Sequence, residues 1–124
     1  MSIAIRIRCN ELELAAELNE STTARAIADV LPVEGVVSTW GEEVYFSIPI
    51  DAEMDMDARA EMAIGELAFW PPGNAFCIFF GATPASTSDE PAAASPCNPV
   101  GHITDDITPL FDIRSGAVIR LEQG

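Results

Sequence analysis

The sequence contains no lysine and little positive charge of any kind. Six arginines stand against twenty aspartates and glutamates, which gives a formal net charge of −14 over 124 residues. A surface of this sign repels phosphate backbones and anionic lipid head groups. We therefore expect neither nucleic acid nor membrane as a partner. A basic partner is compatible with the charge, although solubility alone is sufficient to explain it.

Long hydrophobic runs are also missing. No apolar run approaches the roughly 18 residues needed to span a bilayer, and the start, MSIAIRIRCNELEL, lacks a continuous apolar segment with a small-residue cleavage site. These features predict a cytoplasmic protein. With 48% hydrophobic residues, a chain of this length can bury a core of its own. We expect residues 1–124 to form a single domain and make no prediction of its oligomeric state.

Cysteine and histidine, the usual residues of disulfide frameworks and zinc sites, are scarce. Cys9, Cys77 and Cys97 are odd in number and form no CxxC pair, so we expect three reduced thiols. His102 is the only histidine, and one histidine without clustered cysteines cannot complete a zinc site of the usual kind. The sequence predicts neither a metal nor a cofactor.

Regular alternation and one helical pattern define the first third of the chain. Apolar residues alternate with charged ones over 3–9 and again over 12–16, which predicts a hairpin that turns at Asn10. Apolar spacing changes to that of a helix from Ser21, which can cap its start, to Leu31, where Pro32 stops it. This is the one main helix that the sequence predicts.

The remainder of the chain is typical of short strands. A Gly-Glu-Glu turn predicts one hairpin and the Pro-Pro-Gly-Asn sequence a second, and two short strands end the chain. About eight strands and one helix favour a mainly β fold, a closed eight-stranded antiparallel barrel. The predicted strands cover residues 36–40, 44–48, 66–70, 75–80, 100–103 and 117–121.

Two segments have the composition of connections. Residues 83–99, TPASTSDEPAAASPCNP, predict a long exposed loop. The acidic segment 51–61 resembles a calcium loop only superficially, because Met56 replaces the required glycine and Met62 the bidentate acid. We expect a solvated connection there or a short helix.

Candidate catalytic groups are few. Cys97 lies five residues before His102, but no nearby cation or helix start would lower the pKa of its thiol. Two carboxylate pairs, Glu42-Glu43 and Asp105-Asp106, fall in predicted turns, where acids are usually hydrated. We assign no catalytic role to these groups.

The aromatic residues are more suggestive. Strand alternation places half of them outside a barrel unless another segment covers them, and exposed aromatics form binding surfaces. Filling the core and lining a groove are both compatible with the sequence. The set comprises Trp40, Tyr45, Phe46, Phe69, Trp70, Phe76, Phe79 and Phe80.

One segment carries a family resemblance. Residues 65–81, GELAFWPPGNAFCIFFG, resemble the cyclophilin superfamily, in which an apolar strand runs through a Gly/Pro/Asn turn into a Phe-Phe strand. The later Asn98-Pro-Val-Gly-His-Ile is similar to that family's short strand with a central glycine. The order of TWGEEVYF, WPPGN, GATP and Ser95-Pro resembles, more closely, the small prokaryotic proteins called atypical cyclophilins.

The resemblance implies a cyclophilin-like barrel and peptidyl-prolyl isomerase activity, but this sequence departs from the family pattern. The strand expected to carry the catalytic arginine reads VVSTW, and the position of the family's histidine falls near Cys97. Phe80 takes the place of the pocket phenylalanine, while Tyr45 falls near the family's glutamine and Trp70 near its pocket-wall alanine. The resemblance therefore implies a groove that has lost its catalytic group.

Two hypotheses follow for the function. The first is a weak peptidyl-prolyl isomerase or a binder of proline-containing peptide. The alternative is a non-enzymatic module that binds a small molecule or a partner subunit in the same groove, and the missing arginine favours it. The predicted ligand-binding residues are Trp40, Tyr45, Trp70, Asn74 and Phe80.

Overall fold

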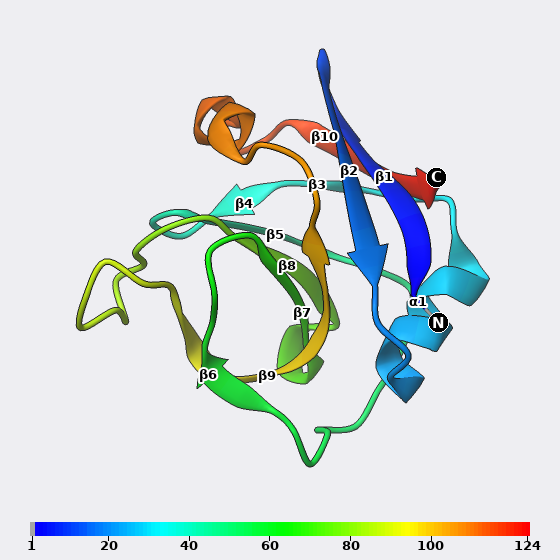
Figure 1. Ribbon diagram of the computed structural model, residues 1–124, viewed down its shortest axis with the longest axis horizontal. Coiled ribbons are helices and arrows are strands. Elements are labelled where there is room, and N and C mark those ends of the chain that lie inside the picture. Colours follow the sequence, from blue (N-terminus) through cyan, green and yellow to red (C-terminus); the bar gives the residue numbers. More distant parts are fainter. Residues whose placement is uncertain (1) are drawn as a thin grey trace.

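The computed structural model describes residues 2–124 and consists mainly of antiparallel β-strands with one α-helix among them (Figure 1). No helix in the described part of the chain is long and apolar enough to cross a membrane. In chain order the elements are β1 (Ile3–Cys9), β2 (Leu12–Leu18), α1 (Thr22–Val30), β3 (Val33–Val36), β4 (Ser38–Thr39), β5 (Glu43–Ser47), β6 (Arg59–Glu61), β7 (Glu66–Trp70), η1 (Pro71–Gly73), β8 (Ala75–Phe79), β9 (Ala92–Ile103), η2 (Thr108–Asp112) and β10 (Val118–Gln123).

The strands form one ten-stranded sheet. Their order is β3-β10-β1-β2-β9-β7-β8-β5-β4, and β6 pairs with β9 beside this path. The prediction of a mainly β, antiparallel fold with one main helix is confirmed. The sheet has ten strands and not eight, and its order ends at β3 and β4 without a ladder between them in residues 2–124, so a closed barrel is not confirmed.

The first hairpin follows the alternation in the sequence. Strands β1 and β2 pair from Ile3↔Leu18 to Cys9↔Leu12, and Asn10 has the positive φ of 55° that such a tight turn needs. The apolar members of both strands lie in the main core, whereas Arg6 and Arg8 face outward. The predicted hairpin is therefore confirmed.

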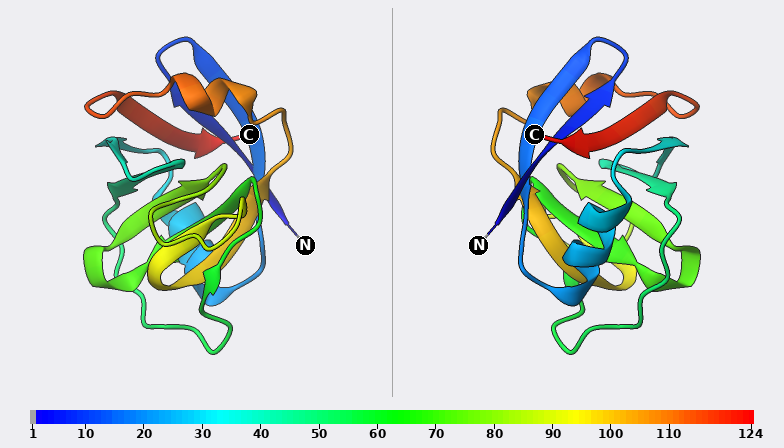
Figure 2. Two further views of the ribbon diagram at one scale, coloured as in Figure 1. Left: turned by 90° about the vertical axis from the view of Figure 1, so that its left-hand side faces the viewer. Right: turned by 90° about the vertical axis from the view of Figure 1, so that its right-hand side faces the viewer.

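The helix is also confirmed within one residue at each end. Ser21 caps it, because its Oγ accepts a hydrogen bond from the backbone N–H of Ala24 at 3.1 Å. Ala24 and Ile27 are buried in the main core, and the helix ends before Pro32. Figure 2 shows α1 lying against the strands, which closes one side of that core.

Strands β5, β8 and β7 are buried on both faces. One face carries Val44, Phe46, Phe76 and Ile78 into the main core. The other face belongs to a second, smaller core formed by Met62, Ala68, Ala75, Cys77, Phe79, Ala93 and Cys97, with Tyr45 and Trp70 packed against it. Because both faces are covered, all five residues of β8 are buried, which explains its continuous apolar sequence AFCIF.

The segment covering the second face differs from its prediction. Residues 83–99 do not form one exposed loop, because β9 begins at Ala92 and its first half pairs with β6. The register shift between Arg59 and Glu61 leaves room for Pro96, which cannot donate to a ladder. The acidic segment 51–61 contains no helix, and its last three residues form β6.

Candidate functional site

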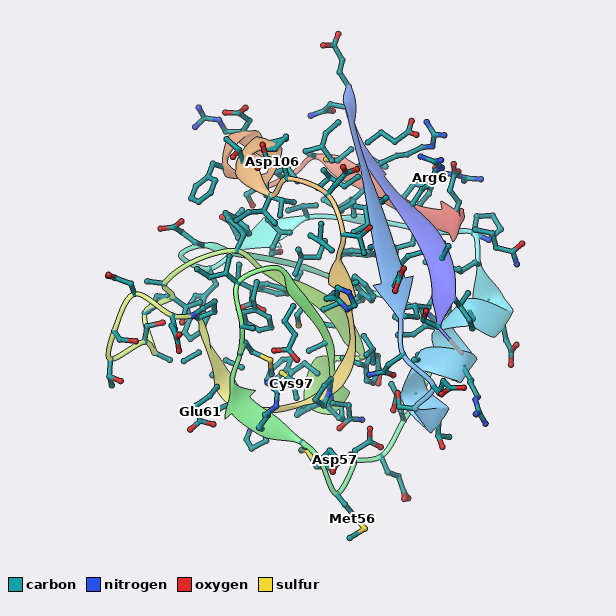
Figure 3. The ribbon with its side chains drawn as sticks, viewed as in Figure 1. Arg6, Met56, Asp57, Glu61, Cys97 and Asp106 are labelled. Atoms are coloured by element: carbon teal, nitrogen blue, oxygen red, sulfur yellow. The ribbon has the colours of Figure 1, made fainter. Side chains whose placement is uncertain are left out.

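A cavity of about 240 Å³ opens between the second face of β5, β7 and β8 and the first half of β9. Strands β5 to β9 curve around this region (Figure 1), and the Cys97 side chain lies within it (Figure 3). Its walls combine three aromatic rings with one carboxyl and two thiols. The lining residues are Trp40, Glu43, Tyr45, Trp70, Cys77, Ala93, Ala94 and Cys97.

The strand register explains how these side chains come together. Glu43 and Tyr45 are two residues apart on β5 and therefore lie on the same face of the sheet. Tyr45 is directly opposite Cys77 on β8. Trp70 ends β7, and its Nε1–H donates a hydrogen bond to Ser95 Oγ of β9 at 2.7 Å. That bond ties the covering strand to the aromatic wall.

The WPPGN sequence positions the Trp70 ring. A Cβ placed on Gly73 would lie 2.8 Å from Trp70 Cζ3 and 2.9 Å from Cε3, so only glycine lets the 3₁₀ turn approach the indole this closely. Asn74 follows in the left-handed conformation with φ 48°, and its carbonyl accepts a hydrogen bond from Ile48 N at 2.9 Å. The WPPGN turn therefore fixes the position of the Trp70 ring in the wall of the cavity.

Glu43 is the unusual group in the cavity. The residue is only 6% exposed, and desolvation raises the pKa of its carboxyl to about 7, an effect that a hydrogen bond with Cys77 partly offsets. The pKa of the Cys77 thiol is raised well above its ordinary value, first by its hydrogen bond with Cys97, then by burial and by the nearby Glu43. Cys77 is therefore a neutral thiol and a poor nucleophile at neutral pH.

The structure brings three of the five predicted ligand-binding residues together. Trp40, Tyr45 and Trp70 line the cavity. Asn74 and Phe80 do not line it: Asn74 is part of the turn behind Trp70, and Phe80 packs in the main core against Phe111, with ring centroids 5.0 Å apart. Phe80 and the even-numbered positions before it face the main core, whereas the cavity lies on the opposite face of β8. This alternation explains why Phe80 does not line the cavity.

Sequence reasoning missed Glu43, Cys77 and Cys97. Glu43 was expected in a hydrated turn, but β5 starts at this residue and turns its side chain inward. Its spacing of two from Tyr45 is the signal that could have placed both on one face. Their burial depends on β9, which the composition of residues 83–99 did not predict.

The other candidate groups of the sequence, His102 and Asp106, do not line the cavity. His102 is exposed on β9, in register with Glu17 and Glu66. Residues 2–124 contain no group of three or more His, Cys, Asp or Glu side chains placed to hold a metal ion. Asp106 lies two residues before η2, and hydrogen bonds from the backbone N–H and hydroxyl of Thr108 hold its pKa below the ordinary value.

Comparisons with known proteins agree with this architecture. A family model described as cyclophilin-like matches residues 2–122. The solution structure of a hypothetical protein from Archaeoglobus fulgidus is similar, with a TM-score of 0.83 and 33% sequence identity over 99% of this chain and 95% of that one. No curated protein matches the chain. The match over nearly the whole chain, together with the shared fold, shows that the chain belongs to the cyclophilin-like family.

Proposed function

We propose that this chain is a cyclophilin-like binding module whose cavity receives a small molecule or a short proline-containing segment. The observation that carries the proposal is the open cavity whose wall of three half-buried aromatic residues, Trp40, Tyr45 and Trp70, stands around the buried Glu43 carboxyl. Ligand pockets typically combine apolar and aromatic lining with a few convergent polar groups. Binding is therefore the activity that this geometry supports best.

The cavity lacks the group that isomerisation would need. Cyclophilins stabilise the twisted amide with an arginine, which acts as a charged donor, and none of the eight lining residues is cationic. Arg6, Arg8 and Arg120 form ion pairs on the outer face of β1 and β10, and Arg59 pairs with Glu66. A weak peptidyl-prolyl isomerase remains the second candidate, since an apolar cavity of this size suits a proline ring.

An exchange NMR experiment separates the two candidates. An Ala-Pro tetrapeptide is titrated into labelled protein while its cis–trans exchange is measured. We expect no measurable acceleration of exchange, and ligand-dependent shifts at Trp40, Tyr45 and Trp70. Measurable but slow acceleration would favour the weak isomerase, and acceleration comparable with that of ordinary cyclophilins would overturn the preference for binding, because the lining residues include no arginine to stabilise the twisted amide.

Variants locate the contact surface. Trp40→Ala removes a wall of the cavity and should weaken any peptide binding by about 2 kcal/mol or more if the indole is an anchor. Phe111→Ala is the matched control, because Phe111 is a 54% exposed aromatic that packs on Phe80 away from the cavity. Shifts confined to residues 51–61, with the cavity residues silent, would contradict the proposal and indicate a basic partner on the acidic segment.

Further properties of the chain are proposed on the same grounds. We propose that the segment 33–39 closes the barrel, because β3 pairs with β10, β4 pairs with β5, and Val37 between them exchanges 2.8 Å hydrogen bonds with Ala117 and Gly116. One domain covers the chain in this proposal. Its three free cysteines fit a reducing, cytoplasmic location, and its net charge of −14 disfavours nucleic acid and membrane as partners.

A further inference from the structure

We propose that the cavity selects a small organic ammonium ion, which the Glu43 carboxylate neutralises while Trp40, Tyr45 and Trp70 surround it with ring faces. This inference rests on the proposed binding function and names the chemical class of the ligand. It is carried by the composition of the cavity lining, in which one acid and three electron-rich rings occur together without any cation.

The sign of the ligand charge follows from the lining. Aromatic rings attract cations through the negative potential of their faces, and the attraction strengthens as the cation loses water. Glu43 is the only carboxyl among the lining residues, and it is 6% exposed, so little water screens it. The net charge of −14 adds a long-range field of the same sign. An anionic ligand would be disfavoured by each of these features.

The size of the ligand follows from the cavity. Its volume of about 240 Å³ is below the range of roughly 300–1,000 Å³ that is common for sites of drug-sized ligands. The space therefore suits a compact head group better than an extended molecule. A methylated ammonium places apolar methyl groups against the rings and its charge near the carboxylate.

A cation would also supply the positive charge that the cavity lining lacks. Desolvation keeps Glu43 partly protonated near neutral pH, with a pKa of about 7. The titratable groups that share the cavity are Tyr45 on β5, Cys77 on β8 and Cys97 on β9, and none of them carries positive charge. A bound cation favours the ionised carboxyl and lowers its pKa, so binding below pH 7 releases a proton.

The opposite pH dependence distinguishes a rival ligand. A neutral ligand with a carbonyl oxygen would accept a hydrogen bond from the protonated Glu43 carboxyl, and its affinity would fall as the pH rises through 7. The affinity of an ammonium ion should instead rise over the same range. If only the ionised form binds, a pKa of about 7 gives an affinity about tenfold higher at pH 8 than at pH 6.

The test compares choline with its neutral isostere 3,3-dimethylbutanol, using tryptophan fluorescence and amide chemical shifts at pH 6 and pH 8. We expect choline to bind more tightly than the alcohol at pH 8 and to show the tenfold rise with pH. A trimethyllysine peptide of neutral sequence, run beside free choline, shows whether the ammonium group belongs to a free molecule or to a protein segment. Tighter binding of choline or of the trimethyllysine peptide than of the neutral alcohol supports the inference.

Two variants complete the test. Glu43→Gln should lose at least tenfold in choline affinity at pH 8 while still binding the alcohol, and Glu42→Gln removes the same charge from the adjacent residue, which does not line the cavity, and should leave both affinities unchanged. If Glu43→Gln does not fold, the pH dependence of the wild type still decides. Binding of the alcohol with choline no tighter, or affinity falling with pH, overturns the ammonium inference but leaves the binding proposal. Silence of the cavity residues toward every probe, the Ala-Pro peptide included, overturns both.

Discussion

Glu43 is an acid that the fold holds in an apolar cavity, and this has a consequence for stability. In the unfolded chain the carboxyl titrates near its ordinary pKa of 4.5, whereas in the folded protein burial raises the pKa to about 7. Between these values the folded state binds more protons than the unfolded state. The free energy of unfolding therefore falls as the pH rises from about 4.5 to 7 and stays lower above that range.

We predict that Glu43→Gln removes this pH dependence. The shift corresponds to at most about 3 kcal/mol, so the variant should gain stability relative to the wild type at pH 8 and show little gain at pH 4.5. Urea unfolding at several pH values measures the difference. Asp89→Asn, in the exposed loop before β9, is the control and should leave the pH profile unchanged. A constant difference between Glu43→Gln and the wild type across the range would contradict the prediction.

The sequence predicted the aromatic residues of the candidate site but not its buried carboxyl and thiols, Glu43, Cys77 and Cys97. Trp40, Tyr45 and Trp70 could be selected because large aromatics flank two predicted turns. Glu43 and Cys97 could not, because their burial depends on contacts between β5, β8 and β9 that are distant along the chain. Sequence patterns predict that a carboxyl in a turn is hydrated, because they do not show which distant segment will cover it.

At the scale of elements, β9 joins the two cores. Its first half pairs with β6, and its second half lies between β2 and β7. Gly101, the central glycine of NPVGHI, lies opposite Leu18 of β2. A Cβ on Gly101 would lie 2.0 Å from the carbonyl oxygen of Glu17, so the strands must separate to admit any side chain.

We predict that Gly101→Ala destabilises the protein by about 3 kcal/mol or more, since overpacking against backbone is not relieved by a rotamer change. Gly116→Ala is the matched control. Gly116 has a φ of +96° with no atom within 4 Å of its Cβ position, so only backbone strain of about 1 kcal/mol is expected. Chemical denaturation of both variants measures the difference. Equal losses would show that β2 and β9 can separate at little cost.

Elements with a clear period were predictable and those with ambiguous composition were not. The alternation of β1 and β2 and the capped helix from Ser21 gave nearly correct boundaries because each has a buried face of its own. Residues 92–99 have the Ala, Ser and Pro content of a loop and become a strand because β6 and β7 offer partners. Tertiary pairing overrides weak local preference in such a segment.

At the scale of the whole molecule, charge is distributed unevenly. Arg6, Arg8 and Arg120 lie together on the outer face of β1 and β10, where they pair with Glu13, Glu34 and Glu122. Three arginines are matched there by three glutamates, so the excess of negative charge lies elsewhere. In Figure 3 the acidic residues Asp57 and Glu61 lie at the edge of the molecule opposite Arg6.

This distribution predicts that salt stabilises the protein. Repulsion among acids acts over the whole surface, and raising the ionic strength shortens the screening length from about 10 Å at 0.1 M to about 3 Å at 1 M. The few exposed ion pairs that salt weakens contribute little. We expect the midpoint of thermal unfolding to rise by several degrees between low and high sodium chloride, since about 1 kcal/mol corresponds to roughly 4 °C.

A charge variant tests whether the acidic segment is the source. Asp51→Asn, Glu53→Gln and Asp57→Asn together remove three exposed acids of the segment 51–61, in which Asp57 lies on the side of the molecule opposite Arg6 (Figure 3). The triple variant should unfold at a higher temperature than the wild type at low salt, and the gap should narrow as salt is added, because screening removes the same repulsion. A midpoint that falls with salt in the wild type, or a variant less stable than the wild type at every salt concentration, would show that the ion pairs around β1 and β10 outweigh the surface repulsion.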